Sequence, residues 1–299
     1  MRARLRIMAS MKRLNSDARA RCLHALCEGS SIRAVSRMTG VSKTTLLKLI
    51  EDAGSAAAWY QDRVLQNLNC KFIQADEAWG FCGSKAANTS PEKIKAKEAG
   101  DVWLWIALDP ETKLVVNWYV GDRSGRAALA FIDDLERRLA RRIQLTTDSY
   151  RPYAGAVQEV FGHDIDYGQV VKLFGKVPEA FKGVYSPAQC IGQRKQRIAG
   201  NPDRATTSTS HVERNNLNVR MHSRRMTRLT NAHSKKMANH AHAMALHFLY
   251  YNFVRQHATL RVSPAMAAGV SSRLWEMKDV VTLIETWETM QARQKGLHY

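Results

Sequence analysis

The stretch Asp101-Val-Trp-Leu-Trp-Ile-Ala-Leu108 decides the fold of this chain. It is apolar without interruption after Asp101 and rich in Val, Ile and Trp, which predicts a strand buried on both faces. The following residues 109–112, Asp-Pro-Glu-Thr, predict a turn. We therefore expect residues 113–120 to form a strand that pairs with 101–108 as an antiparallel hairpin.

Further strands and helices are expected on both sides of this hairpin. Their order predicts a mixed α+β domain, with a five-stranded mixed sheet and flanking helices, in the arrangement of the ribonuclease-H-like fold. The expected elements outside the hairpin are a strand at 71–76, a helix at 126–140, a strand at 143–148, a helix at 153–161, a strand at 165–174, and helices at 210–227, 234–256 and from 272 onward.

Residues 15–54 predict three short helices, at 17–28, 32–38 and 43–52. A small residue at Ser36, a turn glycine at Gly40 and inward apolar residues after it are typical of a helix-turn-helix DNA reader. The outward side chains that could reach phosphates or base edges are Ser42, Lys43, Thr44 and Lys48. The alternative is a structural three-helix bundle.

The charge balance points to a polyanionic partner. Lys and Arg number 45 and Asp and Glu 27, a formal net charge of +18, which suits nucleic acid or an acidic membrane surface. No apolar run is long enough for a membrane span, and the opening residues lack the apolar core of a secretory signal. The five cysteines form no C-x2-C pair, so we expect reduced thiols rather than a structural zinc site.

Three acids fall where the expected fold places acidic groups: Asp76 in the first strand, Asp148 at the end of the fourth, and Glu213 on a late helix. Carboxylates at central sheet positions are costly unless they are paired or bind a cation. We therefore expect two Mg²⁺ ions, with Mn²⁺ as a substitute, at a phosphodiester-processing site. Alternatively Asp76 caps a strand while Glu77 is the functional acid, Asp148 caps the next helix, and Glu213 is only solvated.

A long basic stretch follows Glu213. No Asp or Glu occurs from Arg214 to Trp275, which suits a metal ligand beside a phosphate track. Arg220 is expected two helical turns after Glu213, where it could hold a phosphate, and Asn216 one turn after it, where it could orient a carboxylate. The basic residues expected to contact DNA here are Arg214, Arg220, Arg224, Arg225 and Arg228.

Several segments resemble the insertion-sequence-one family of bacterial transposases. The resemblance covers about residues 11–270 and implies a DDE transposase, with Asp76, Asp148 and Glu213 as its acidic triad and Arg220 as an additional DNA contact. Members made from two reading frames carry an amino-terminal zinc finger, which this chain lacks. The matching segments include Gly29–Lys43, Ile73-Gln-Ala-Asp-Glu-Ala-Trp79, Leu145-Thr-Thr-Asp148 and His211-Val-Glu-Arg-Asn-Asn-Leu217.

The resemblance implies binding of terminal inverted repeats in double-stranded DNA, 3′-end cleavage and strand transfer, by a homodimer or higher oligomer in the bacterial cytoplasm at the nucleoid. The alternatives are a DNA-binding regulator with a dead site and a ribonuclease-H-like nuclease without strand transfer. The expected division is a disordered basic arm (1–13), a helix-turn-helix domain (14–58), a linker (59–70), a catalytic domain (71–232) with an insertion (175–208), and a helical carboxy-terminal region (233–299).

Overall fold

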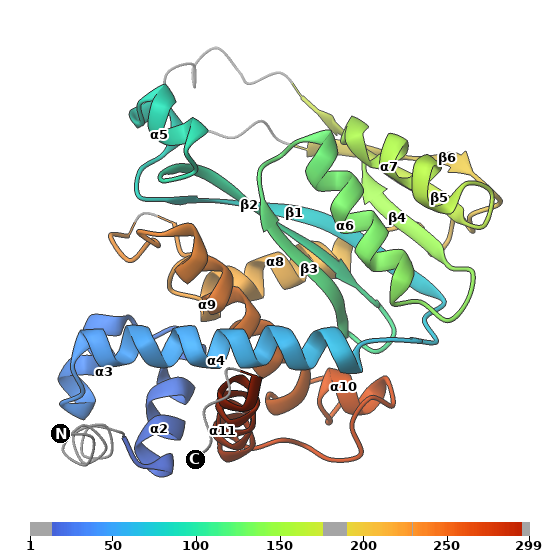
Figure 1. Cartoon of the computed structure of the whole chain (residues 1–299). Coiled ribbons are helices and arrows are strands. Elements are labelled where there is room, and N and C mark those ends of the chain that lie inside the picture. Colours follow the sequence, from blue (N-terminus) through green and yellow to red (C-terminus); the bar gives the residue numbers. More distant parts are fainter. Residues whose placement is uncertain (1–13, 176–189, 229, 295–299) are drawn as a thin grey trace.

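The computed structural model describes residues 14–175, 190–228 and 230–294, so the expected basic arm lies outside the described residues. Its centre is a six-stranded sheet in the order β3-β2-β1-β4-β5-β6, with helices on both faces (Figure 1). Strand β1 pairs antiparallel with β2 and parallel with β4. The strands are β1 (Phe72–Cys82), β2 (Gly100–Leu108), β3 (Val115–Gly121), β4 (Gln144–Asp148), β5 (Asp166–Phe174) and β6 (Cys190–Ala199).

Side chains of β2 point alternately to the two faces of the sheet, and both faces are apolar. Trp105 packs into one cluster with helices α6 (Gly125–Arg137) and α7 (Arg151–Phe161). Leu104 packs into a second cluster with α8 (Ser210–His222) and α9 (Met237–Leu249). Because successive strand residues point to opposite faces, an uninterrupted apolar strand is what a sheet covered on both sides requires. The mixed α+β layering expected from the sequence is confirmed.

Three helices precede the sheet: α2 (Ser16–Cys27), α3 (Ile32–Thr39) and α4 (Lys43–Val64). Ser31 and Ser42 cap the second and third of them by accepting a hydrogen bond from a backbone amide three residues on. Gly40, at φ 72°, forms the turn between them. The expected end of the third helix at residue 52 is wrong, because α4 continues to Val64, into the residues expected to form a linker.

The middle of α4 consists of small residues that allow close packing on α9. Ala53, Ala56 and Ala57 are buried, and α4 packs along α9. A Cβ added at Gly54 would lie 2.4 Å from the carbonyl oxygen of His242, so the two helix backbones approach closely at this point. The small residues are a packing surface, and α4 therefore passes without a break from the three-helix region onto the sheet domain.

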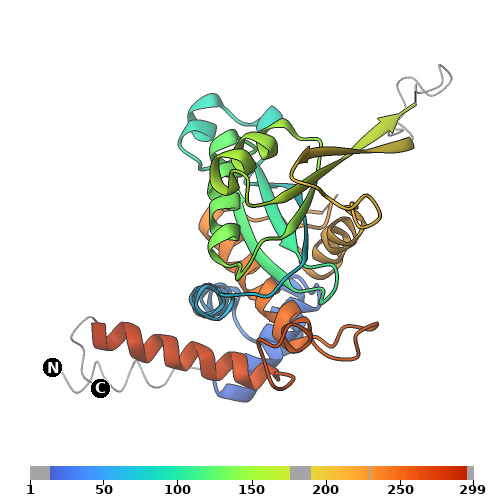
Figure 2. The same ribbon diagram turned by 90° about the vertical axis from the view of Figure 1, so that its right-hand side faces the viewer.

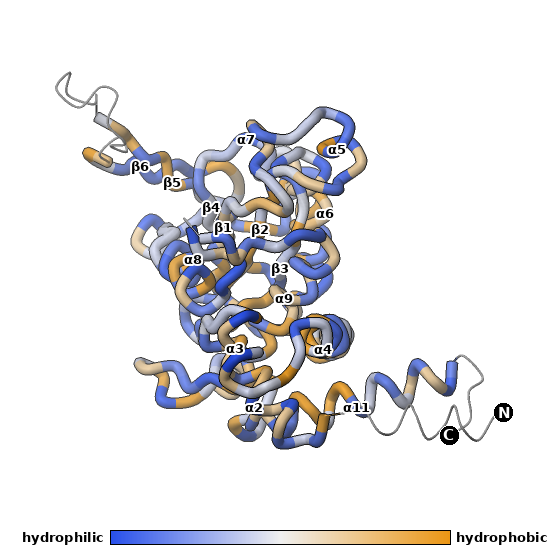
Figure 3. Tube along the Cα trace, turned by 90° about the vertical axis from the view of Figure 1, so that its left-hand side faces the viewer, coloured by the Kyte–Doolittle hydropathy of each residue, from blue (hydrophilic) through white to orange (hydrophobic). Residues whose placement is uncertain are grey.

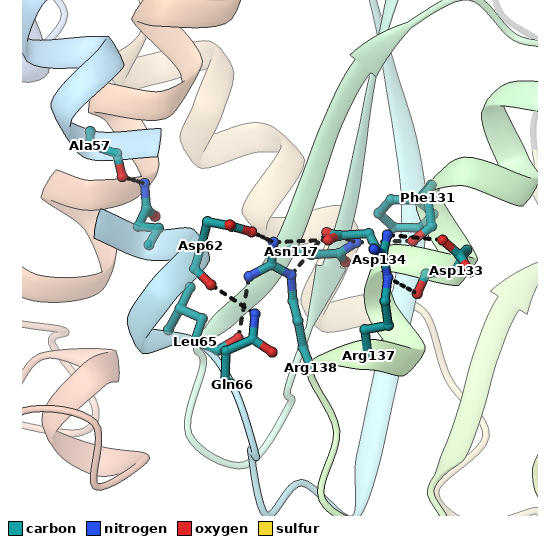
Figure 4. Close-up of polar contacts among 11 residues, drawn as sticks. Ala57, Asp62, Leu65, Gln66, Asn117, Phe131, Asp133, Asp134, Arg137 and Arg138 are labelled. Carbon is teal, nitrogen blue, oxygen red and sulfur yellow. Dashed lines mark hydrogen bonds and ion pairs between the residues drawn. The ribbon is translucent and has the colours of Figure 1, made fainter. Parts of the chain in front are cut away.

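A polar network fixes the end of α4 to the sheet domain (Figure 4). Arg138, which is buried, donates to the carboxylate of Asp62 on α4 at 2.9 Å and to the carbonyl of Leu65 at 3.3 Å. Its Nε donates to Asp134 on α6 at 2.9 Å, and Asn117 of β3 donates to the same carboxylate at 3.2 Å. A buried arginine is stable only when its donors are satisfied, so this network holds α4, α6 and β3 in one arrangement.

The sheet has six strands rather than the expected five. The additional strand, β6, lies within the insertion expected at 175–208 and pairs antiparallel with β5. Most side chains of β6 are exposed, so its sequence lacks the alternation of a strand with one buried face. The β5–β6 hairpin projects from the body of the molecule, as Figures 2 and 3 show from opposite sides.

The carboxy-terminal region also differs in detail from the expectation. The long helix expected at 234–256 is α9 followed by a π-helical turn, η3 (Tyr250–Val254). The polar segment 84–100 contains the short helices η1 (Ala86–Asn88) and α5 (Pro91–Lys95), and the chain ends with α10 (Pro264–Ala267) and α11 (Met277–Gln294). Within the described residues, no helix has both the length and the apolar character needed to cross a membrane.

The packing of α4 on α9 predicts the effect of Gly54→Ala. Helix propensity alone would stabilise the protein by about 1 kcal/mol. Overpacking against the α9 backbone costs about 1–3 kcal/mol. We expect a net loss of stability in urea unfolding. The control is Gly155→Ala in α7, where nothing lies within 4 Å of the added Cβ and a small gain is expected. Equal gains in both variants would contradict the close packing.

Candidate active site

Strand pairing brings two acids together at the centre of the sheet. The parallel register of β1 and β4 runs to the pair Ala75 and Thr147, so Asp76 and Asp148 are the next residues in line. Carboxylate oxygens of Asp76, Glu77 and Asp148 lie within 4.8 Å of one another. Among the described residues this is the one group of His, Cys, Asp and Glu side chains spaced to hold a metal ion.

Glu77 has its own fixed partners. Arg123 donates to its Oε1 at 2.8 Å, and the hydroxyl of Tyr153 donates to its Oε2 at 3.0 Å. The Arg123 guanidinium also lies over the rings of Trp103 and Tyr150, at 4.5 and 4.1 Å from their centroids. Both oxygens of Glu77 are therefore committed to the surrounding protein, and its carboxylate is 1% exposed.

The hydrogen bonds to Asp76 and Asp148 come from amide groups rather than from a charged side chain. Asn216 of α8 donates to Oδ2 of Asp76 at 2.8 Å, and the backbone amide of Tyr150 donates to Oδ1 of Asp148 at 2.9 Å. Burial, together with the neighbouring charges of Glu77 and Asp148, raises the pKa of Asp76 to about 7. A carboxyl group with such a pKa marks a site where negative charge is crowded and poorly hydrated, and a cation would relieve that cost.

Helix α8 is fixed along β1 at three successive points. The side-chain carbonyl of Gln74 accepts hydrogen bonds from the first backbone amides of the helix, those of His211 and Val212, at 2.9 and 3.2 Å. Asn216 reaches Asp76 one turn later, as described above. Arg220 donates to the backbone carbonyl of Trp79 at 3.0 Å. These contacts determine where Glu213 lies relative to the strand acids.

Glu213 lies near the acid cluster but is not part of it. Its Oε1 pairs with Lys172 of β5 at 2.9 Å and accepts a hydrogen bond from Thr209 at 2.6 Å. The charge of Glu213 contributes to the raised pKa of Asp76, so the two carboxylates are close enough to interact electrostatically. Lys172 in turn interacts electrostatically with Asp76 and Asp148 as well as with Glu213. The ammonium group of Lys172 is therefore attracted by all three carboxylates, those of Glu213, Asp76 and Asp148.

The basic residues expected to contact DNA have different surroundings. Arg220 gives hydrogen bonds to backbone carbonyls, a structural role that the sequence did not indicate. Arg225 is half-buried and donates to Ser234 at 2.9 Å. Lys48 pairs with Asp52 at 2.7 Å. Ser42 is occupied as a helix cap. The remaining members of the set are exposed: Lys43, Thr44, Arg214, Arg224 and Arg228.

Sequence reasoning missed Gln74, Arg123 and Lys172. Gln74 precedes Asp76 by two residues, so it points to the same face of the strand, a relation that the sequence contains. A lysine within an expected strand also indicates a charge partner. The partner of each residue, however, lies on an element far away in the sequence, so the pairs could not be read from the sequence.

Comparisons with known proteins add little to these observations. No protein-family model and no curated protein matches the chain. Among solved structures, a piggyBac transposase synaptic complex with hairpin DNA is similar at 11% identity and a TM-score of 0.38, over 95% of this chain and 73% of that one. The Mos1 strand transfer complex is similar at 12% identity and a TM-score of 0.24, over 80% and 76%. Similarity this low carries no argument, and the resemblance to the insertion-sequence-one family stays a prediction.

The raised pKa of Asp76 predicts a pH-dependent stability in the metal-free protein. Since the folded pKa is about 7 against an ordinary 3.8, its contribution to stability is complete below pH 4 and is lost as the pH rises through 7. Asp76→Asn does not titrate. We expect it to raise the melting temperature in EDTA more at pH 8 than at pH 5.

The control for this measurement is Glu159→Gln, since Glu159 is an exposed acid on α7. It should leave the melting temperature within the error of the wild type at both pH values. Parallel melting curves for Asp76→Asn and wild type across the pH range would show that Asp76 is not a crowded, poorly hydrated carboxyl group.

Proposed function

We propose that this protein is a metal-dependent DNA transposase of the insertion-sequence-one type, which cleaves 3′ ends of a mobile element and joins them to target DNA. The observation that carries the proposal is the approach of the Asp76, Glu77 and Asp148 carboxylates to within 4.8 Å, at the centre of a mixed sheet. A chain with a formal charge of +18 is suited to bring such a site to a polyanion.

The residues present fit a divalent cation such as Mg²⁺ or Mn²⁺. Carboxylate oxygens are the donors that these ions prefer, and Asp76 and Asp148 offer them without competing ion pairs among the described residues. When bound, the ions would activate a water or a 3′-hydroxyl and stabilise the leaving oxygen of the phosphodiester. Asn216 would hold the Asp76 carboxylate in one orientation for this purpose.

We assign Glu213 as the third member of the acidic set. It would join Asp76 and Asp148 by exchanging its pair with Lys172 for the metal, and Lys172 would then be free to contact a phosphate. Glu77 is the alternative third acid. Its buried pair with Arg123 and its hydrogen bond from Tyr153 favour a structural role, because leaving them would uncover a buried charge.

The helix-turn-helix region would supply the contact with duplex element ends. Lys43 and Thr44 at the start of α4 are exposed, as a recognition helix that uses its first turn requires. Two ends must be joined at one time, so the proposal includes a homodimer or larger assembly. A regulator with a dead site and a nuclease without strand transfer are the other candidates, and one assay separates all three.

The assay uses a labelled duplex end, target DNA and Mg²⁺. We expect strand joining by the wild type. Asp76→Asn, Asp148→Asn and Glu213→Gln should each lose activity by at least about 100-fold, because each removes a carboxylate ligand of the divalent ions that stabilise the transition state. Glu159→Gln is the matched control and should retain activity.

The outcomes distinguish the candidate functions. Binding without cleavage would indicate a regulator, and cleavage without joining a nuclease. Full activity in Glu213→Gln together with loss in Glu77→Gln, in protein that remains folded, would move the third acid to Glu77.

A further inference from the structure

A cavity of about 920 Å³ lies between the helix-turn-helix region and the segment that joins α8 to α9. On one side the lining comes from the end of α2, the start of α3 and the first two turns of α4; on the other it comes from residues 222–225, 230–233 and 235–236 and part of α9. The acid cluster is not part of its lining. The cavity is therefore a second candidate site, separate from the one described above.

The lining is strongly basic. It contains six lysine and arginine side chains and no carboxylate. None of the six forms an ion pair with an acid in the part of the chain that the structure describes. Uncompensated cations around a concave surface attract an anion, because the surrounding low-dielectric protein concentrates their field. The six are Arg33, Lys43, Arg224, Arg225, Lys235 and Lys236.

Three residues of the lining contain buried polar atoms that have no hydrogen-bond partner. Both ring nitrogens of His247, a side chain that is 5% exposed, lack a hydrogen-bond partner, as do Nη2 of Arg225 and Nδ1 of His233. All three residues line the cavity. A buried donor or acceptor left unpaired is costly, and a polar ligand toward which these side chains could shift would relieve that cost.

The cavity also has an apolar component. Leu26, Leu47, Ile50 and Leu246 contribute to its lining beside the cations. Its volume lies within the range of about 300–1,000 Å³ that is typical of small-ligand pockets. A nucleotide unit combines the two properties required, since it has an anionic phosphate and a base with an apolar face. A duplex is too wide to be enclosed by this volume and could only lie across its opening.

The walls are held in place before any ligand binds. The turn between α2 and α3 contacts the end of α8, where a Cβ on Gly29 would lie 2.8 Å from the carbonyl oxygen of Met221. Gly29 has a φ of 86°, so any other residue would also be strained there. Glu28 approaches His222 at 3.6 Å and accepts a hydrogen bond from Tyr250 at 2.5 Å. A preformed site loses less entropy on binding than one that must be ordered.

Helix α8 connects the cavity to the acid cluster. Glu213 lies in its first turn and His222, a lining residue, ends it. Nine residues of helix span about 13.5 Å along the axis. A nucleic-acid strand processed at the acid cluster could therefore continue along α8 into the cavity.

We propose that this cavity binds phosphate groups, taking nucleotide units of a single-stranded nucleic acid in preference to duplex. The proposal rests on the nucleic-acid specificity of the proposed function but not on chemistry at the acid cluster. The same lining would also accept a free nucleotide, and the experiment separates these two sources of phosphate.

The test measures binding of the full chain to fluorescein-labelled hexathymidylate and to a blunt duplex, in EDTA so that no metal-dependent step takes part. The variant is Arg224→Gln with Lys236→Gln, which removes two exposed lining cations. Its matched control is Arg63→Gln with Arg126→Gln, which removes two exposed cations outside the cavity.

We expect hexathymidylate to bind the lining variant at least about tenfold more weakly than wild type, the effect of losing a charge-assisted hydrogen bond. The control should stay within twofold, and duplex binding by the lining variant should change less than hexathymidylate binding. Competition by thymidine monophosphate with a Kd equal to that of hexathymidylate would support the phosphate site and identify its ligand as a free nucleotide.

Two results would overturn the proposal. Unchanged hexathymidylate binding in the lining variant would remove the cavity as a phosphate site. Equal weakening in the lining variant and the control, or of hexathymidylate and duplex, would reduce the lining to part of a general basic surface. Loss of catalysis at the acid cluster with retained binding of hexathymidylate would count only against the proposed enzymatic function.

Discussion

The parallel pairing of β1 with β4 is the constraint on which the candidate site depends. It places Asp76 next in register to Asp148, in a sheet that is covered by helices on both faces. Two carboxylates so placed repel each other and lose hydration, and burial together with these charges raises the pKa of Asp76 to about 7. A divalent cation bound at these carboxylates, as proposed above, would offset this cost.

The helix that follows the sheet is positioned by the same strand. Gln74, Asp76 and Trp79 of β1 each accept a hydrogen bond from successive parts of α8. The helix therefore holds Glu213 near the two strand acids, and the residue at its other end, His222, lines the basic cavity. Lys172 neutralises Glu213 in the metal-free protein, which lowers the repulsion that three or four clustered acids would otherwise produce.

The sequence predicted five of the six strands and the positions of Asp76 and Asp148 within them, because both depend on local patterns. The apolar run 101–108 and the turn after it define the hairpin. By contrast, α4 was expected to end near residue 52; the Ala- and Gly-rich stretch that follows instead continues the helix and packs closely on α9. Strand β6 was missed because its side chains are mostly exposed and follow no period. The partners of Glu213, Glu77 and Arg220 could not be predicted, because each pair joins residues that are distant in sequence.

The most direct measurement of the central claim is anomalous diffraction from crystals of the protein soaked with Mn²⁺. We expect a manganese peak within coordination distance of carboxylate oxygens of both Asp76 and Asp148. We also expect Glu213 to leave Lys172 and turn toward the ion. The absence of manganese between Asp76 and Asp148 at saturating concentration, with the pair between Lys172 and Glu213 intact, would contradict it.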